Sequence, residues 1–180
     1  MFVLLLTIPH DRPNTLNSFI LSVDDDISTA AAVGFTAFAN QSRPYNIQEI
    51  VLYDSIITNY GGYYNPLTSS FICPVHGIYM FYVNTNVAGS DIVIQLNRNT
   101  INLVDSWARI DVSDDFNHGS NLVVTECDLG DVIWGRVIAS NGQKTLYGSA
   151  TRVTTFSGLL VSRMWSGGSV IIINACPTFI

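Results

Sequence analysis

Apolar and polar residues alternate in short runs along most of this chain. Between Phe71 and Phe81 the apolar positions share one parity, so a period of two places them on one face of a β-sheet. Pro74 and Gly77 interrupt this stretch and indicate an edge position and a corner. The pattern therefore predicts two strands joined by a turn.

The same periodicity predicts further strands downstream. Residues 91–96 alternate and are separated by a polar turn from the apolar positions of 101–103, which is typical of a β-hairpin. The runs 122–129 and 132–138 around a Gly-Asp turn predict a second hairpin. About ten such runs, with no helical period, indicate an all-β sandwich or barrel.

Composition narrows the class of protein. Charged residues make up 12% of the 180 residues and hydrophobic residues 48%, which favours a heavily buried sheet domain over disorder. The net charge of -6 and the scattered arginines provide no basic stripe for nucleic acid, so metal cations or basic partners suit the chain better.

The chain offers no clear membrane or redox signal. No apolar run approaches the ~20 residues of a membrane-spanning helix. The run 2–8 has no preceding basic residue and is a substandard signal peptide. Three cysteines without a C-x-x-C spacing indicate neither a disulfide scaffold nor a zinc site.

Several spaced motifs resemble the globular-head domain of complement C1q. The pattern T-N, Y-N, then T-x-x-F-x-C-P-V-x-G-x-Y-x-F covers 58–81, although Ser69 replaces a usual glycine and Asn65 a common aspartate. Further similar segments are the opening strand at 33–38, L-G-D-V-I-W at 129–134 and T-F-S-G-L-L at 155–160.

This resemblance implies a ten-stranded jelly roll of the C1q/tumour-necrosis-factor-like type at residues 33–162. Residues 1–32 are then a poorly packed N-terminal leader, and residues 163–180 are a C-terminal extension. The resemblance also implies a homotrimer, closed by apolar residues of the sheet containing Phe71, Tyr79 and Phe81 or of its neighbours.

The function implied is that of a secreted, non-enzymatic, lectin-like pattern-recognition protein of innate immunity, which binds microbial surface glycans or proteins. The alternative is an extracellular structural or signalling ligand that engages a receptor or matrix protein. No nucleophile, metal or phosphate motif points to an enzyme, and the three histidines are far apart in sequence.

Ligand contacts are expected on loops, because the inward faces of a jelly roll form the core. Tyr60 and Tyr63 flank a Gly-Gly pair, and Trp107 lies close to Arg109 in an acidic segment. Rings beside hydrogen-bonding groups suit a sugar. The alternatives are ordinary sheet packing for the tyrosines and a core-capping role for Trp107.

The acidic segment also suggests a calcium site. Asp105, Asp111 and Asp115 could supply oxygen ligands where some relatives hold the ion, with solvated side chains as the alternative. The family topology places Cys73 and Cys127 inward on neighbouring strands, either as a disulfide or as free thiols. Asn40 starts the only N-x-S/T triplet and is a glycosylation candidate if the protein is secreted.

Overall fold

The computed structural model describes residues 3–6, 19–22, 32–88, 91–109, 116–139 and 144–164. The chain divides into two compact units, Met1–Ala32 and Val33–Ile180. In the first unit β1 (Val3–Leu6) pairs antiparallel with β2 (Phe19–Ser22). The described residues contain no helix that could cross a membrane.

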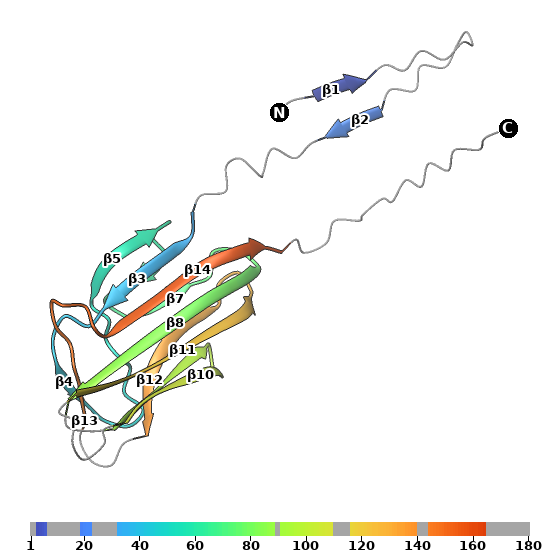
Figure 1. Ribbon diagram of the computed structural model, residues 1–180. Coiled ribbons are helices and arrows are strands. Elements are labelled where there is room, and N and C mark those ends of the chain that lie inside the picture. The colour runs from blue at the N-terminus through green and yellow to red at the C-terminus, as the bar shows by residue number, and fades with distance from the viewer. Residues whose placement is uncertain are drawn as a thin grey trace, which may run out of the picture. The chain divides into compact units, whose positions relative to one another are not determined.

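The second unit is a sandwich of two antiparallel sheets (Figure 1). The larger sheet has the order β4-β13-β8-β14-β3-β5, and β11 pairs with the free edge of β8. Its strands are β3 (Gly34–Phe38), β4 (Arg43–Tyr45), β5 (Ser55–Tyr60), β8 (Gly77–Ala88), β11 (Phe116–Cys127), β13 (Lys144–Leu146) and β14 (Thr155–Arg163).

The smaller sheet has the order β10-β9-β12-β7-β6. Its strands are β6 (Tyr64–Asn65), β7 (Ser70–Ile72), β9 (Ile92–Arg98), β10 (Ile101–Ala108) and β12 (Val132–Ala139). The predicted all-β sandwich is confirmed. The described part of this unit has twelve strands because pieces of two or three residues, such as β4 and β6, add to the longer runs.

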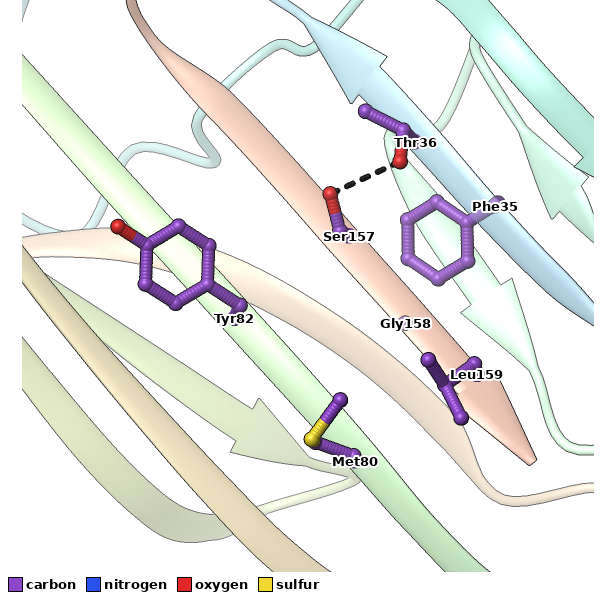
Figure 2. Close-up of a pocket in the computed structure, with 7 residues that line it drawn as sticks. All are labelled: Phe35, Thr36, Met80, Tyr82, Ser157, Gly158 and Leu159. Atoms are coloured by element: carbon purple, nitrogen blue, oxygen red, sulfur yellow. Dashed lines mark hydrogen bonds between the residues drawn. The ribbon is translucent and has the colours of Figure 1, made fainter. Parts of the chain in front are cut away.

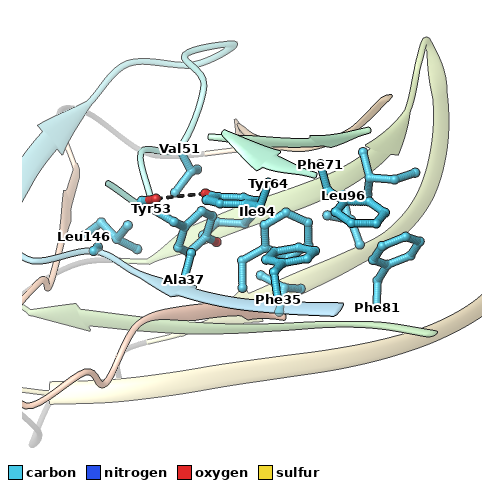
Figure 3. Packing of buried hydrophobic residues seen from close by; sticks show 14 of the residues in the cluster. Phe35, Ala37, Val51, Tyr53, Tyr64, Phe71, Phe81, Ile94, Leu96 and Leu146 are labelled. Atoms are coloured by element: carbon cyan, nitrogen blue, oxygen red, sulfur yellow. Dashed lines mark hydrogen bonds between the residues drawn. The ribbon is translucent and has the colours of Figure 1, made fainter. Parts of the chain in front are cut away.

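Aromatic rings fill the space between the sheets (Figure 3). Phe35 stacks on Tyr64 and Phe71, with ring centroids 4.5 and 5.0 Å away. Phe71 in β7 meets Phe81 of β8 edge-on at 5.8 Å. The prediction of a single face from Phe71 to Phe81 is therefore wrong: the corner at Pro74–Gly77 carries the chain from one sheet to the other, and the shared parity reflects burial from both sides.

The two predicted hairpins have different outcomes. Strands β9 and β10 do pair across the turn at Asn99, whose positive φ of 53° suits a tight connection. The predicted pairing of β11 with β12 is wrong, because β11 pairs with β8 while β12 pairs with β9 and β7. The turn around Gly130, with φ of 88°, instead links the two sheets.

The strands β10 and β11 meet where the two sheets come together along one side. A Cβ on Gly119 would lie 2.1 Å from the carbonyl oxygen of Trp107, so only glycine permits this approach. Asn121 donates its side-chain amide to the Asp105 carbonyl at 3.0 Å. These contacts satisfy part of the β10 edge and fix the position of the residues that follow Asp105.

Candidate functional site

The outward face of the larger sheet carries an apolar surface on three adjacent strands. Val124 of β11 lies opposite Met80 of β8, and Met80 lies opposite Leu159 of β14. In the next row Leu122 lies opposite Tyr82. We call these five residues the apolar face; Val124 is 58% exposed and Leu122 is 47% exposed. Large exposed apolar side chains on neighbouring strands are typical of an interaction surface.

A shallow hollow of about 100 Å³ lies on the side of this face formed by β8, β14 and β3 (Figure 2). Thr36 and Ser157 form its polar end through a hydrogen bond of 3.0 Å between their hydroxyl groups. Its other lining residues are Met80, Tyr82, Leu159, Phe35 and Gly158. The hollow is too small and too open for a buried small-molecule site, which normally requires several hundred Å³.

Phe71, Tyr79 and Phe81, which mark the sheet expected to provide the trimer contact, do not lie on the apolar face. Phe71, Tyr79 and Phe81 are fully buried inside the isolated domain, so they form its core and have no surface to contact another subunit. The outward residues that alternate with Tyr79 and Phe81 on β8 are Met80 and Tyr82. The larger sheet therefore carries apolar side chains on both faces. The residues that alternate with Tyr79 and Phe81 form its exposed face.

The predicted ligand-binding residues fall into two separate groups. Tyr60 ends β5 opposite Gly34 in the larger sheet and is 60% exposed, beside the row that contains Leu159. Tyr63 precedes β6, at one edge of the smaller sheet. Trp107 lies on β10, at the other edge of that sheet. With strands about 4.8 Å apart, four steps separate those edges by roughly 19 Å, so the two groups form no common pocket.

Trp107 does not occupy the core. Its side chain is 59% exposed, and the Arg109 guanidinium carbon lies 5.9 Å from the ring centroid. Both residues are thus available to a ligand, although Trp107 is in a strand and only Arg109 follows it. A similar pair was missed in the sequence: Arg136 lies 5.8 Å from the Trp134 ring on β12. The repeated W-x-R spacing is the signal that could have revealed it.

The calcium residues are only partly described. Asp105 lies within β10 and not in a loop, and its Oδ1 accepts a 3.4 Å hydrogen bond from Gln95. Asp111 and Asp115 lie outside the described residues. No group of three acidic, cysteine or histidine side chains suited to a metal occurs within the described ranges. Asp105 provides one candidate oxygen ligand, and the calcium site stays a prediction.

The two described cysteines are fully buried thiols in contact with one another. Their hydrogen bond, together with burial, raises the pKa of Cys73, and the same bond lowers the pKa of Cys127. The prediction of neighbouring strands is wrong, because Cys73 follows β7 in the smaller sheet and Cys127 ends β11 in the larger one. The turn after Cys127 brings them together: the Cys73 backbone N–H donates to the Asp131 carbonyl, and the Cys73 carbonyl accepts from the Gly130 N–H, both at 2.8 Å.

Two other polar positions have defined surroundings. Asn40 is exposed just after β3, and its backbone N–H donates to Asp54 at 3.1 Å. Its side chain is accessible, so glycosylation there stays a prediction. His76 lies 2.7 Å from Glu126 and 3.8 Å from Asp128. The 2.7 Å contact is a hydrogen bond between His76 and Glu126 at the sandwich corner.

The comparisons with known proteins agree with this architecture. The family model described as the C1q domain matches residues 34–161. The chain belongs to the C1q domain family. The structure of the globular domain of the zebrafish complement 1qA protein superposes with a TM-score of 0.62 at 19% identity, covering 73% of this chain and 99% of that one. The predicted jelly roll of the C1q/tumour-necrosis-factor-like type is confirmed.

Relatives of this C1q-domain chain are longer proteins. It is 27% identical to mouse complement C1q and tumor necrosis factor-related protein 9 over 74% of its own length and 38% of the relative's. It is 28% identical to a mouse complement C1q subcomponent over 71% and 49%, respectively. The chain therefore spans less than half the length of these relatives. The structure of Eiger TNF from S. frugiperda shares the fold, with a TM-score of 0.58 at 10% identity over 77% of this chain and 98% of that one.

Proposed function

We propose that this C1q-domain chain is a homotrimeric recognition module that acts outside the cell by binding microbial surface glycans or proteins. The proposal includes no catalytic step. C1q and TNF-like domains are generally non-enzymatic ligand-binding proteins and typically form trimers. Secretion is proposed from the same family membership.

The apolar face is the observation that carries the trimer. Five outward side chains on β8, β11 and β14 share it, and none is charged. Exposing such a face to water is unfavourable for an isolated domain. Each Å² of apolar surface that a partner subunit buries stabilises the assembly by about 25 cal/mol. A closed ring of three copies buries the same patch on every subunit and leaves no free apolar surface.

Recognition then falls to surfaces that the ring leaves open. Trp107 and Arg109 lie on the smaller sheet, whose outward face is distinct from the apolar face. Tyr63 lies at the other edge of that sheet and is available for a second contact. Tyr60 lies beside the apolar face, so we assign it to subunit contact in preference to ligand binding.

Light scattering on the purified chain tests the trimer. The expected mass is three times the 19.8 kDa of one copy at micromolar concentration. Val124→Asp should yield a folded monomer, because a buried unpaired carboxylate is costly in the ring and harmless on the isolated surface. Leu129→Asp is the matched control, since Leu129 is 73% exposed in the turn after β11. A monomeric wild type, or a trimeric Val124→Asp, contradicts the proposal.

A glycan and protein array tests recognition. Reproducible binding to bacterial polysaccharides supports the recognition module, and binding confined to receptor or matrix proteins supports the structural or signalling alternative. Absence of both from a trimeric preparation contradicts recognition while leaving the assembly intact.

A further inference from the structure

Two tryptophan–arginine pairs occupy the outward face of the smaller sheet. Trp107 and Arg109 belong to β10 and the residue after it, while Trp134 and Arg136 belong to β12, and β9 lies between these strands. Each guanidinium carbon lies within 6 Å of its ring centroid, at 5.9 and 5.8 Å. The sandwich thus presents an apolar face on one sheet and an aromatic, hydrogen-bonding face on the other.

The strand register sets the spacing of these groups. Along β9, Trp134 lies opposite Asn97, Arg136 opposite Gln95 and Trp107 opposite Val93. The three β9 positions are two residues apart, so indole, guanidinium and indole follow one another along the same face. Two strand steps of about 4.8 Å and four residues of about 3.4 Å place the indoles roughly 17 Å apart, farther than one sugar ring spans.

A polar row connects the two indoles. Gln95 accepts from Arg136 Nε at 3.0 Å and Nη2 at 2.7 Å, and its own amide donates to Asp105 Oδ1 at 3.4 Å. Gln95 is only 9% exposed, so the row is fixed before any ligand arrives. Arg136 keeps donors in its remaining N–H groups, and Asp105 keeps an acceptor in Oδ2.

This arrangement fits a saccharide better than other ligands. Indoles stack on the apolar face of a sugar ring, while a fixed donor and a fixed acceptor between them match its hydroxyl groups. Asp105 and the net charge of -6 oppose nucleic acid and polyanions. An extended peptide would add along the β10 edge, which is partly occupied by Gly119 and Asn121 of β11, and would leave Trp134 on β12 without a contact.

We propose that the outward face of β10-β9-β12 binds an uncharged oligosaccharide whose rings carry mostly equatorial hydroxyl groups. Trp107 and Trp134 stack on separate rings, and Asp105 and Arg136 hydrogen-bond the sugar between them. This inference rests on the proposed recognition function and gives it a ligand class and a site. The site lies on the sheet opposite the apolar face, so trimer formation leaves it open.

Isothermal titration of the full chain with cellotetraose and chitotetraose tests the site. Maltotetraose, which curves, and tri-galacturonic acid, which is charged, are the comparison probes, and glucose tests the need for length. We expect one of the β-linked tetraoses to bind best and glucose to bind at least about tenfold more weakly, since it reaches one indole only. Tryptophan fluorescence should shift on binding.

Variants assign the binding to residues. Trp107→Ala and Arg136→Met should each raise the Kd roughly tenfold with the trimer mass unchanged. Trp107→Ala should leave the melting temperature unchanged, whereas Arg136→Met should lower it, because the buried Gln95 side chain loses two hydrogen bonds. Leu67→Ala is the control, since Leu67 is 89% exposed in the turn between β6 and β7, at the far edge of the smaller sheet. Trp134→Phe retains a ring but loses the indole N–H bond to Asn99 at 2.9 Å, and should weaken binding less than Trp107→Ala.

The possible failures are distinct. If no saccharide binds while the protein remains trimeric, the sugar site is wrong and the assembly stands. If a tetraose binds equally to Trp107→Ala and Arg136→Met, recognition of glycans is right but this face is not the site. Stronger binding of tri-galacturonic acid than of every neutral probe overturns the uncharged ligand.

Discussion

Gly158 provides the most direct test of the packing between the two sheets. It lies in β14 on the inward side, and a Cβ added there would lie 2.5 and 2.6 Å from two carbons of the Phe81 ring and 2.7 Å from one of Phe35. Both rings are buried and held by stacked neighbours, so neither can rotate away freely. Gly158→Ala therefore forces atoms together in a closely packed core.

The expected cost follows from core overpacking. Extra methyl groups in well-packed interiors typically cost about 1–3 kcal/mol, and three contacts this short place Gly158→Ala at the upper end, about 3 kcal/mol. For a chain of this size about 2–4 °C is lost per kcal/mol, so we expect the melting temperature to fall by roughly 6–12 °C. Gly135→Ala is the control: it is buried in β12, and its nearest contact would be Ile94 at 3.4 Å, an ordinary separation.

Thermal and urea unfolding measure this difference. All variants are compared at one protein concentration, because the proposed trimer would make stability depend on concentration. Phe81→Leu in the Gly158→Ala background should recover part of the loss, since it removes the ring atoms that clash. A Gly158→Ala melting temperature equal to that of Gly135→Ala would refute the reasoning, and so would strict additivity with Phe81→Leu.

Three further outcomes follow from the core. Tyr64→Phe should cost about 1 kcal/mol of unfolding free energy, because it removes the 2.8 Å hydrogen bond to the Tyr53 carbonyl. Tyr53→Phe should cost nothing, since the Tyr53 hydroxyl has no partner among the described residues. Urea unfolding distinguishes the two variants, and equal losses would contradict the assignment. Burial raises the pKa of Tyr79 to about 12. The neutral phenol therefore contributes stability that is complete below the pKa of the unfolded chain, near 10, and is lost as the pH rises toward 12. A melting temperature that stays constant from pH 9 to 12 would count against this. Oxidised glutathione should convert Cys73 and Cys127 into a disulfide once local opening of the fold lets the reagent reach them, and the intact mass should fall by two hydrogens. A mass that never changes would show that the pair stays as thiols.

Local pattern was sufficient for some elements and insufficient for others. The alternation in 92–96 and the turn at Asn99 specify a hairpin by themselves, because both strands lie within a few residues of one another. The turn at Gly130 has equally good hairpin chemistry, yet it joins two sheets. Strand β11 pairs with β8, and β12 pairs with β9, in preference to the pairing of β11 with β12. Competition between distant strands decides that outcome and leaves no local trace.

The site residues show the same limit. Trp107 and Arg109 were recognised because they stand close together in a polar segment, and their exposure agrees with that prediction. Trp134 and Arg136 were hidden inside a strand motif that the family resemblance already explained. Only the register through β9 places the two pairs on one face, and register across three strands is set by the whole sheet.

The position of β8 has a consequence for how the domain is made. This strand lies between β11 on one side and β14 on the other, so its partners emerge from the ribosome roughly 40 and 80 residues after it. Contacts this distant in sequence slow folding, and a nascent chain ending before Thr155 exposes a long row of unpaired backbone groups along one edge of β8 to other chains. Chains that end before Thr155 should therefore yield aggregates instead of a shortened functional domain, and chaperone demand should end only when β14 is synthesised.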